Sequence, residues 1–295
     1  MEALSAPLAQ EDYFLAGHLE DLFRSKIAKS QATGKDGMRI GRFQNHLTDE
    51  AALIEKKIKQ STYRFTTFKE RLILRGADRA PRQISIPTVR DRLALRAVCQ
   101  VLHNHVPETS GSSPHALVDQ VVKSIRSGEQ SSKVFVRIDV RDFFPSISHT
   151  ILARELRHFG YIDKVRELCQ LAVQTATGAS DKPNERGVPQ GLSISGALSA
   201  IYMLRFDHAQ TKKTPTYFRY VDDILIICEA KEADDILKSV GRALRSRGLI
   251  IHKKGVAGKT EIGPVISGID YLGYHISIDR ISIRDSSFKK MFKNL

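Results

Sequence analysis

The segment that decides the fold is residues 216–229, with the sequence TYFRYVDDILIICE. Two runs rich in aromatic and β-branched residues flank Val221, Asp222 and Asp223. This pattern predicts a β-hairpin with the two carboxylates at its turn. A plain turn explains the pair, because aspartate is common in turns. A bound divalent cation explains it equally well, since two adjacent carboxylates repel each other.

A third carboxylate, Asp139, lies in the β-forming run FVRIDV at residues 135–140. A strand-end cap explains this residue when it is taken alone. A buried, unpaired carboxylate costs several kcal/mol, and carboxylate oxygens are ligands that suit Mg²⁺. Two Mg²⁺ ions about 4 Å apart can activate an attacking hydroxyl and stabilise a leaving oxygen. Together, Asp139, Asp222 and Asp223 therefore predict a two-metal site.

The charge of the chain indicates a polyanionic partner. Its 295 residues include 46 lysines and arginines against 33 acidic residues, a formal net charge of +13. Residues 64–96 hold nine basic and three acidic residues, a net charge of +6. Such an excess favours nucleic acid or an anionic membrane surface as the partner. No run of 18 apolar residues is present, so no membrane-spanning helix is expected.

The cysteines and the N-terminus indicate a cytoplasmic protein. Cys99, Cys169 and Cys228 are widely spaced and make neither a disulfide framework nor a CxxC metal motif. We therefore expect buried thiols in a reducing compartment. The first 14 residues lack the basic and apolar regions of a signal peptide.

The order of predicted elements favours an α+β fold. Helical patterns dominate up to about residue 60, and strands and helices then follow each other without a regular βαβ repeat. This order favours an antiparallel sheet with helices packed on it over a doubly wound parallel sheet.

Several segments resemble, in the same order, the motifs of bacterial reverse transcriptases of the group II intron and retron branch. The run Tyr220 to Asp223 is similar to their Tyr-x-Asp-Asp turn, and Asp139 with Phe143-Phe144 resembles their first catalytic strand. The other similar segments are Gly34 to Gly37 with Phe43, Arg82 to Pro87 with Asp91-Arg92, Gly187 to Gly191 with Ser193 to Ser195, and Tyr271 to Tyr274. The compact architecture resembles the defence-associated or otherwise orphan bacterial reverse transcriptases.

The resemblance implies a role for each matching residue. Asp139, Asp222 and Asp223 would be the catalytic ligands of two Mg²⁺ ions, with the carbonyl of Val140 as a further ligand and Mn²⁺ as a substitute metal. Phe144 would lie under the sugar and exclude a ribose 2′-hydroxyl. The residues implied at the nucleotide are Arg75, Arg82, Gln190 and Lys259, and those implied at the primer and template are Tyr220, Tyr271, Leu272 and Gly273. The alternatives are a solvated basic face for the arginines, a core position for Phe144 and a surface position for Lys259.

The resemblance also implies a right-hand polymerase with fingers, a palm built on an antiparallel sheet, and a thumb that is minimal or absent. We expect a helical extension at 1–33, fingers at 34–132, a palm at 133–278 and a tail or truncated thumb at 279–295. Some fingers elements are expected between 150 and 186. A non-coding RNA or a protein partner would then supply the function of the thumb.

The predicted function is RNA-directed DNA synthesis from deoxynucleoside triphosphates on an RNA template and primer, with an RNA–DNA duplex as product and no membrane partner. A dedicated non-coding RNA template and a role in antiviral defence are part of this hypothesis. Two alternatives remain open: template-independent addition of terminal nucleotides, and a non-catalytic RNA-binding scaffold that uses the basic segment.

Overall fold

The computed structural model describes residues 8–74, 81–127, 132–180, 182–214, 216–255 and 259–284. Contacts divide the chain into two compact units. The first, here called the helical unit, comprises Met1–Ser110 and Phe144–Tyr202. The second, here called the sheet unit, comprises Gly111–Phe143 and Met203–Leu295.

The helical unit consists of helices and one β-hairpin. Its elements are η1 (Asp12–Phe14), α1 (Ala16–Leu22), the π-helix η2 (Phe23–Ile27), α2 (Ile40–Gln44), α3 (Leu47–Lys59), β1 (Lys69–Ile73), β2 (Arg82–Ile86), α4 (Val89–His105), η3 (Pro107–Ser110), α7 (His149–His158) and α8 (Asp163–Gln174). The short helix α6 (Phe143–Ser146) and the long helix α9 (Ser195–Lys213) each belong partly to both units.

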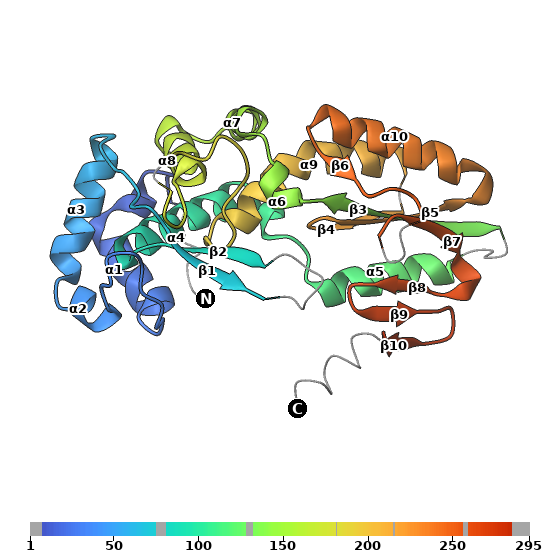
Figure 1. Cartoon of the computed structure of the whole chain (residues 1–295), viewed down its shortest axis with the longest axis horizontal. Coiled ribbons are helices and arrows are strands. Elements are labelled where there is room, and N and C mark those ends of the chain that lie inside the picture. Colours follow the sequence, from blue (N-terminus) through green and yellow to red (C-terminus); the bar gives the residue numbers. More distant parts are fainter. Residues whose placement is uncertain are drawn as a thin grey trace, which may run out of the picture. The chain divides into compact units, whose positions relative to one another are not determined.

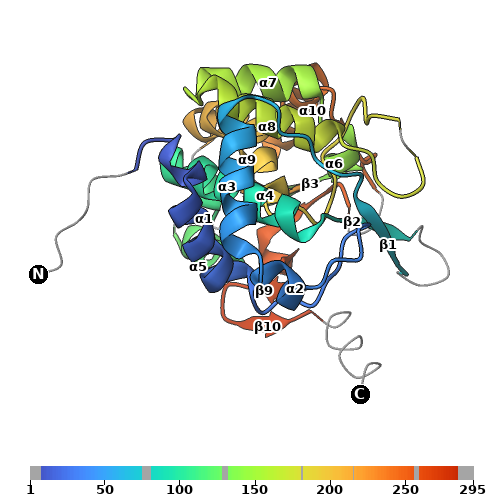
Figure 2. The ribbon, with the colours of Figure 1, turned by 90° about the vertical axis from the view of Figure 1, so that its left-hand side faces the viewer.

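Helix α4 is the central element of the helical unit. Figure 2 shows α1, α3 and α8 around it. Its start is well capped, because the Thr88 hydroxyl accepts a hydrogen bond from the Asp91 amide at 3.1 Å. The buried Asp91 carboxylate in turn accepts from the Tyr63 hydroxyl at 2.9 Å and the Thr66 amide at 3.1 Å. These bonds attach the segment before β1 to the core helix.

The sheet unit contains the remaining strands. Its elements are α5 (Pro114–Arg126), β3 (Lys133–Arg141), β4 (Tyr217–Tyr220), β5 (Asp223–Glu229), η4 (Ala230–Glu232), α10 (Ala233–Ser246), β6 (Ile250–Ile251), β7 (Glu261–Pro264), η5 (Val265–Ser267), β8 (Ile269–Tyr271), β9 (Tyr274–Ile276) and β10 (Ile281–Ile283). The main sheet has the order β4-β5-β3-β6, with β7 also paired to β3, and all of these pairs are antiparallel. A second antiparallel sheet has the order β10-β9-β8.

The main sheet is covered on both faces. In Figure 1, α10 and the end of α9 lie over one face, and α5 and the small sheet lie over the other. Because side chains alternate along a strand, Val136, Ile138 and Val140 of β3 point to one face, where they are buried. Phe135 packs on the opposite face in an apolar cluster with side chains from α5, β5 and β8. Arg137 and Asp139 share this second face.

These sheets confirm the expected α+β class with antiparallel pairing. The three cysteines are buried free thiols, also as expected. Across the described ranges, no helix is both long and apolar enough to cross a membrane.

Candidate active site

The predicted hairpin is present, and its turn is strained. Strands β4 and β5 pair antiparallel with Tyr220 opposite Asp223, so Val221 and Asp222 form the two-residue turn. Val221 has a φ of 55°, a conformation that is rare for a β-branched residue and costs about 1–3 kcal/mol. The Arg219 guanidinium donates to the Val221 carbonyl at 2.9 Å. Arg219, a residue of the same hairpin, therefore stabilises the turn.

The pairing of β3 with β5 brings the third aspartate to this turn. Asp139 lies directly opposite Asp223 in the antiparallel register. One residue further along, the Val140 amide donates to the Asp222 carbonyl at 3.0 Å. Two segments more than eighty residues apart in the chain thus place Asp139, Asp222 and Asp223 at one end of the main sheet.

Asp139 is bound by two basic side chains through the same carboxylate oxygen. Lys259 Nζ donates to Oδ2 at 2.9 Å, and His252 Nε2 lies 3.2 Å from that oxygen. The His252 amide also donates to the Asp139 carbonyl at 3.0 Å. Lys259 was expected near the site, whereas His252 was not. The proximity of His252 follows from the pairing of β6 with β3.

Asp223 is held by Arg137, which sequence reasoning also missed. Arg137 donates to both Asp223 oxygens, from Nε at 3.0 Å and from Nη2 at 2.7 Å. The arginine side chain is only 8% exposed, and its Nη1 lies 3.9 Å from Glu261 Oε1. Burial lowers the pKa of Arg137, but the hydrogen bonds and charge of Asp223 outweigh burial and raise the pKa overall. The sequence does offer one signal for this contact. Arg137 lies two residues before Asp139, and residues two apart on a strand share the same face.

A second buried ion pair supports the hairpin from α9. Asp207 accepts hydrogen bonds at 2.7 Å from Arg219 Nε and from the Tyr217 hydroxyl. Burial and the neighbouring Asp207 carboxylate raise the pKa of Tyr217 well above its ordinary value. Asp207 therefore holds the arginine that binds the Val221 carbonyl.

The carboxylates at the turn are costly to ionise without a cation. Burial raises the pKa of Asp222, and the charges of Asp139 and Asp223 add to the increase. Burial also raises the pKa of Asp223, although Arg137 acts in the opposite direction. A nearby positive charge stabilises the ionised form of such a carboxyl group.

The donor set fits Mg²⁺ because all three side chains provide hard carboxylate oxygens. Within the described part of the chain, however, no three His, Cys, Asp or Glu side chains are gathered closely enough to hold a metal ion. In this arrangement Lys259 and Arg137 provide the positive charge beside Asp139 and Asp223.

The residues expected at the primer form a second turn in the sheet unit. Leu272 and Gly273, with φ values of 49° and 90°, connect β8 to β9, and Tyr271 is opposite Tyr274. Tyr271 is fully buried, and its hydroxyl donates to the Asp223 carbonyl at 3.4 Å. Tyr220, at the end of β4, packs partly buried against the apolar cluster. Tyr271 thus connects this turn to the β4–β5 hairpin that contains Asp222 and Asp223.

Of the residues expected at the nucleotide, Arg82, Gln190 and Phe144 lie in the helical unit and Lys259 lies in the sheet unit. Arg82 on β2 donates through Nε to the Gln190 side chain, and the Ser85 amide donates to the Gln190 carbonyl at 2.7 Å. Phe144 lies in α6, where its carbonyl accepts from the Val188 amide at 2.9 Å. Arg75 lies outside the described residues.

Comparison with known proteins identifies the family of these motifs. Residues 74–276 match the profile of the family described as Reverse transcriptase (RNA-dependent DNA polymerase). The Retron Ec73 reverse transcriptase of Escherichia coli is 28% identical over 177 residues, which cover 53% of this chain and 54% of that protein. The chain therefore spans about half the length of this relative.

Solved structures support the fold. The telomerase of Candida albicans has a TM-score of 0.55 at 15% identity, over 83% of this chain and 49% of that one. The telomerase of Candida tropicalis has a TM-score of 0.54 at 14% identity, over 78% of this chain and 59% of that one. At such identities the likeness concerns the fold alone.

Proposed function

Because the chain belongs to the reverse transcriptase family, we propose that it is an RNA-directed DNA polymerase that adds deoxynucleotides to a primer 3′-hydroxyl. The observation that carries this proposal is the register of the sheet unit, in which Asp139 lies opposite Asp223 at the strained turn that contains Asp222. Two Mg²⁺ ions, or Mn²⁺ in their place, would activate the 3′-hydroxyl and stabilise the leaving pyrophosphate when bound.

In this proposal Asp139, Asp222 and Asp223 bind the metals, with the carbonyl of Val140 as a further ligand. Burial is the largest cause of the raised pKa of Asp222. Because a bound cation would offset the cost of ionising this carboxyl group, the raised pKa supports a role in binding cations. Lys259 is proposed to donate a proton to the leaving pyrophosphate, and the 2.9 Å distance between its Nζ atom and Asp139 supports this role.

The proposed nucleotide contacts are Arg82, Gln190, Phe144 and Arg75. Arginine suits phosphate because its planar guanidinium can donate two hydrogen bonds to one phosphate group. The hydrogen bond from Arg82 to Gln190 supports a joint role, since each residue orients the other. Tyr220 and the turn Tyr271 to Gly273 are proposed to contact the primer and template.

Phe144 is proposed to select deoxynucleotides by excluding the ribose 2′-hydroxyl. The Phe144→Ala enzyme is then expected to incorporate ribonucleotides more readily relative to deoxynucleotides. The ratio of kcat/KM values for the two nucleotides measures this effect. An unchanged ratio would show that Phe144 has only a packing role.

The central test is primer extension with and without template. Asp222→Asn removes one carboxylate charge without breaking the Arg137 ion pair, and it is expected to abolish synthesis. Asp119→Asn in α5 is the matched control, because Asp119 is exposed and lies outside the proposed site. Template-independent extension would instead indicate terminal transfer. RNA binding without synthesis by the wild-type protein would indicate a scaffold.

We further propose that the template is a dedicated non-coding RNA and that the enzyme acts in antiviral defence. Sequencing the nucleic acid that copurifies with the protein tests the first proposal: one predominant RNA species is expected. A mixture of unrelated transcripts would contradict it. Phage challenge of cells carrying the wild type or Asp222→Asn tests the second, and equal phage titres would contradict it.

A further inference from the structure

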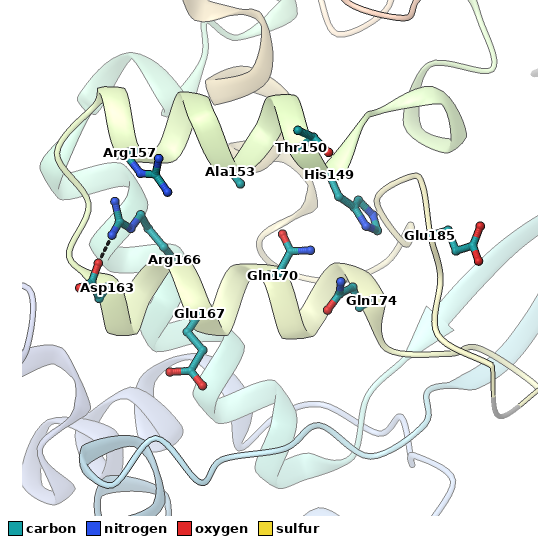
Figure 3. A pocket seen from close by; sticks show the side chains of 10 residues that line it. All are labelled: His149, Thr150, Ala153, Arg157, Asp163, Arg166, Glu167, Gln170, Gln174 and Glu185. Atoms are coloured by element: carbon teal, nitrogen blue, oxygen red, sulfur yellow. Dashed lines mark ion pairs between the residues drawn. The ribbon is translucent and has the colours of Figure 1, made fainter.

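A polar hollow between α7 and α8 in the helical unit plays no part in the proposed function. It has a volume of about 530 Å³, which lies within the range of about 300–1,000 Å³ that is usual for sites of small ligands. Figure 3 shows that both helices contribute side chains to it, with Gln170 pointing from α8 into the space across from Ala153 of α7. The small Ala153 side chain leaves room for a ligand beside this amide.

The charges that line the hollow are separated by sign. Asp163 forms an ion pair with Arg166, and the Glu167 carboxylate lies 3.9 Å from an arginine that does not line the hollow. Arg157 and Glu185 form no ion pair with the lining residues drawn in Figure 3, and they lie at opposite ends of the space. The hollow therefore has a cationic end at Arg157 and an anionic end at Glu185.

His149 adds a hydrogen-bond acceptor at the anionic end. The residue is only 7% exposed, and its Nε2 atom lies 2.7 Å from the Gly187 carbonyl oxygen. Because a carbonyl can only accept, Nε2 carries the hydrogen, and Nδ1 of the neutral ring is an acceptor. Among the described residues Nδ1 has no hydrogen-bond partner, and it is not one of the solvent-inaccessible atoms that lack a partner there. This acceptor is therefore open to the hollow, which His149 lines.

The backbone on both sides of Glu185 is anchored. The Asn184 amide donates to the Gln174 carbonyl at 2.8 Å, and the Asn184 side chain donates to the Thr175 carbonyl at 2.8 Å. On the other side, the Gly187 carbonyl accepts from His149. Because these bonds hold the segment before a ligand arrives, binding at Glu185 costs little conformational entropy.

A ligand that matches this hollow has an anionic group at one end and hydrogen-bond donors at the other. His149 and Arg157 are eight residues apart on α7, which corresponds to about 12 Å of helix. A free amino acid is too short to reach both ends, whereas the phosphate, sugar and base of a nucleotide extend over such a length. The guanidinium of Arg157 suits a phosphate, and its single charge matches one phosphate group better than a triphosphate.

The acceptors at the anionic end favour guanine as the base. Guanine presents two neighbouring donors, its N1–H and its N2 amino group, and the two oxygens of Glu185 can accept from both. Adenine and cytosine each present only an amino group as donor on the corresponding edge. The amide side chains of Gln170 and Gln174 can donate to the O6 and N7 acceptors of guanine.

We propose that the hollow between α7 and α8 binds a free guanine mononucleotide, with its phosphate at Arg157 and its base at Glu185 and His149. This inference does not rest on the proposed function, because the lining of the hollow shares no residue with the proposed metal, nucleotide, primer or template contacts. The protein thus has a second nucleotide site, made of residues other than those of the polymerase site.

Isothermal titration calorimetry of the full chain with guanosine 5′-monophosphate (GMP) in EDTA tests the proposal. Wild type is expected to bind GMP more tightly than AMP or guanosine. Arg157→Gln removes the phosphate partner, so it should weaken GMP and AMP alike and leave guanosine unchanged. Glu185→Gln removes the charged acceptor at the base, so it should weaken GMP but not AMP. Each loss should be about tenfold, which corresponds to one hydrogen bond to a charged group.

Arg42→Gln and Glu108→Gln are the matched controls. Arg42 lies in the last turn of α2, as Arg157 does in α7, and neither control residue lines the hollow. Both controls should bind GMP as wild type does. Because Arg42, Glu108, Arg157 and Glu185 are all exposed, each variant should fold, and an unchanged Tm checks this.

Wild-type affinity for GMP in Arg157→Gln or in Glu185→Gln would overturn the proposal. So would the absence of measurable binding at millimolar GMP, or equal affinities for GMP and inorganic phosphate, because the site would then hold no nucleotide or only a free anion. Loss of GMP binding in Asp222→Asn would also overturn it, since the nucleotide would then occupy the polymerase site. A protein that binds GMP as expected but makes no DNA would contradict only the proposed function.

Discussion

Replacing Arg137 by methionine tests the central ion pair of the site. Arg137 and Asp223 have side chains only 8% and 14% exposed, so the value of about 0–1 kcal/mol for surface pairs does not apply. Removing one partner of a buried pair costs about 3–5 kcal/mol, because the other charge remains buried and unpaired. Glu261, 3.9 Å from Arg137, would lose the same cation. We therefore expect the Arg137→Met change to lower the free energy of unfolding of the metal-free protein by about 3–5 kcal/mol.

Thermal unfolding in EDTA at pH 7 measures this loss. At about 2–4 °C per kcal/mol, the Tm should fall by roughly 6–20 °C. Arg141→Met is the matched control, because this arginine lies on the same strand, is 55% exposed and approaches Asp142 only to 3.8 Å. Its Tm should change little.

A double-mutant cycle shows whether the lost ion pair causes the loss of stability. Because Arg137→Met/Asp223→Asn removes both charges, the double variant should be less destabilised than the sum of the two single variants. Added Mg²⁺ should also raise the Tm of Arg137→Met more than that of wild type, since the ion neutralises the unpaired carboxylate. A loss below about 1 kcal/mol, or strict additivity, would refute the idea that this pair is a strong buried interaction.

Three further predictions concern separate features. Because burial raises the pKa of Asp222, the folded protein binds its proton more tightly than the unfolded chain, and metal-free stability falls as pH rises from about 4 through the raised pKa. Asp222→Asn should therefore raise the Tm in EDTA at pH 7 but not below pH 4, and equal shifts at both pH values would contradict this. Gly191→Ala should lower the Tm, because φ is 103° and a Cβ would lie 2.8 Å from the Ser85 carbonyl oxygen; an unchanged Tm would show that the loop moves aside. Tyr217→Phe removes a hydrogen bond of 2.7 Å to Asp207 and should cost about 1–3 kcal/mol, measured by urea unfolding; a stability equal to wild type would count against it.

Asp139, Asp222 and Asp223 could be picked out from the sequence because the patterns around them are local. Two runs of β-forming residues on either side of Val221, Asp222 and Asp223 predicted the hairpin, and the hairpin is present. The same type of run predicted the strand of Asp139. What such patterns lack is register, since they do not say which residue of one strand faces which residue of another. The strain at Val221 was likewise not visible, because valine normally avoids that conformation.

The sequence by itself determined the carboxylates, the antiparallel α+β class and the family resemblance, because each depends on residue type, spacing or order along the chain. Only the tertiary structure decided which cations stand beside those carboxylates. Arg137 and Asp223 are 86 residues apart, and Lys259 and Asp139 are 120 apart. The physical reason is that a buried charge takes its partner from whichever strand the sheet places beside it, and sheet pairing is a long-range property. The hairpin pattern thus predicts where two of the carboxylates lie, and the register of β3 shows which charges pair with them.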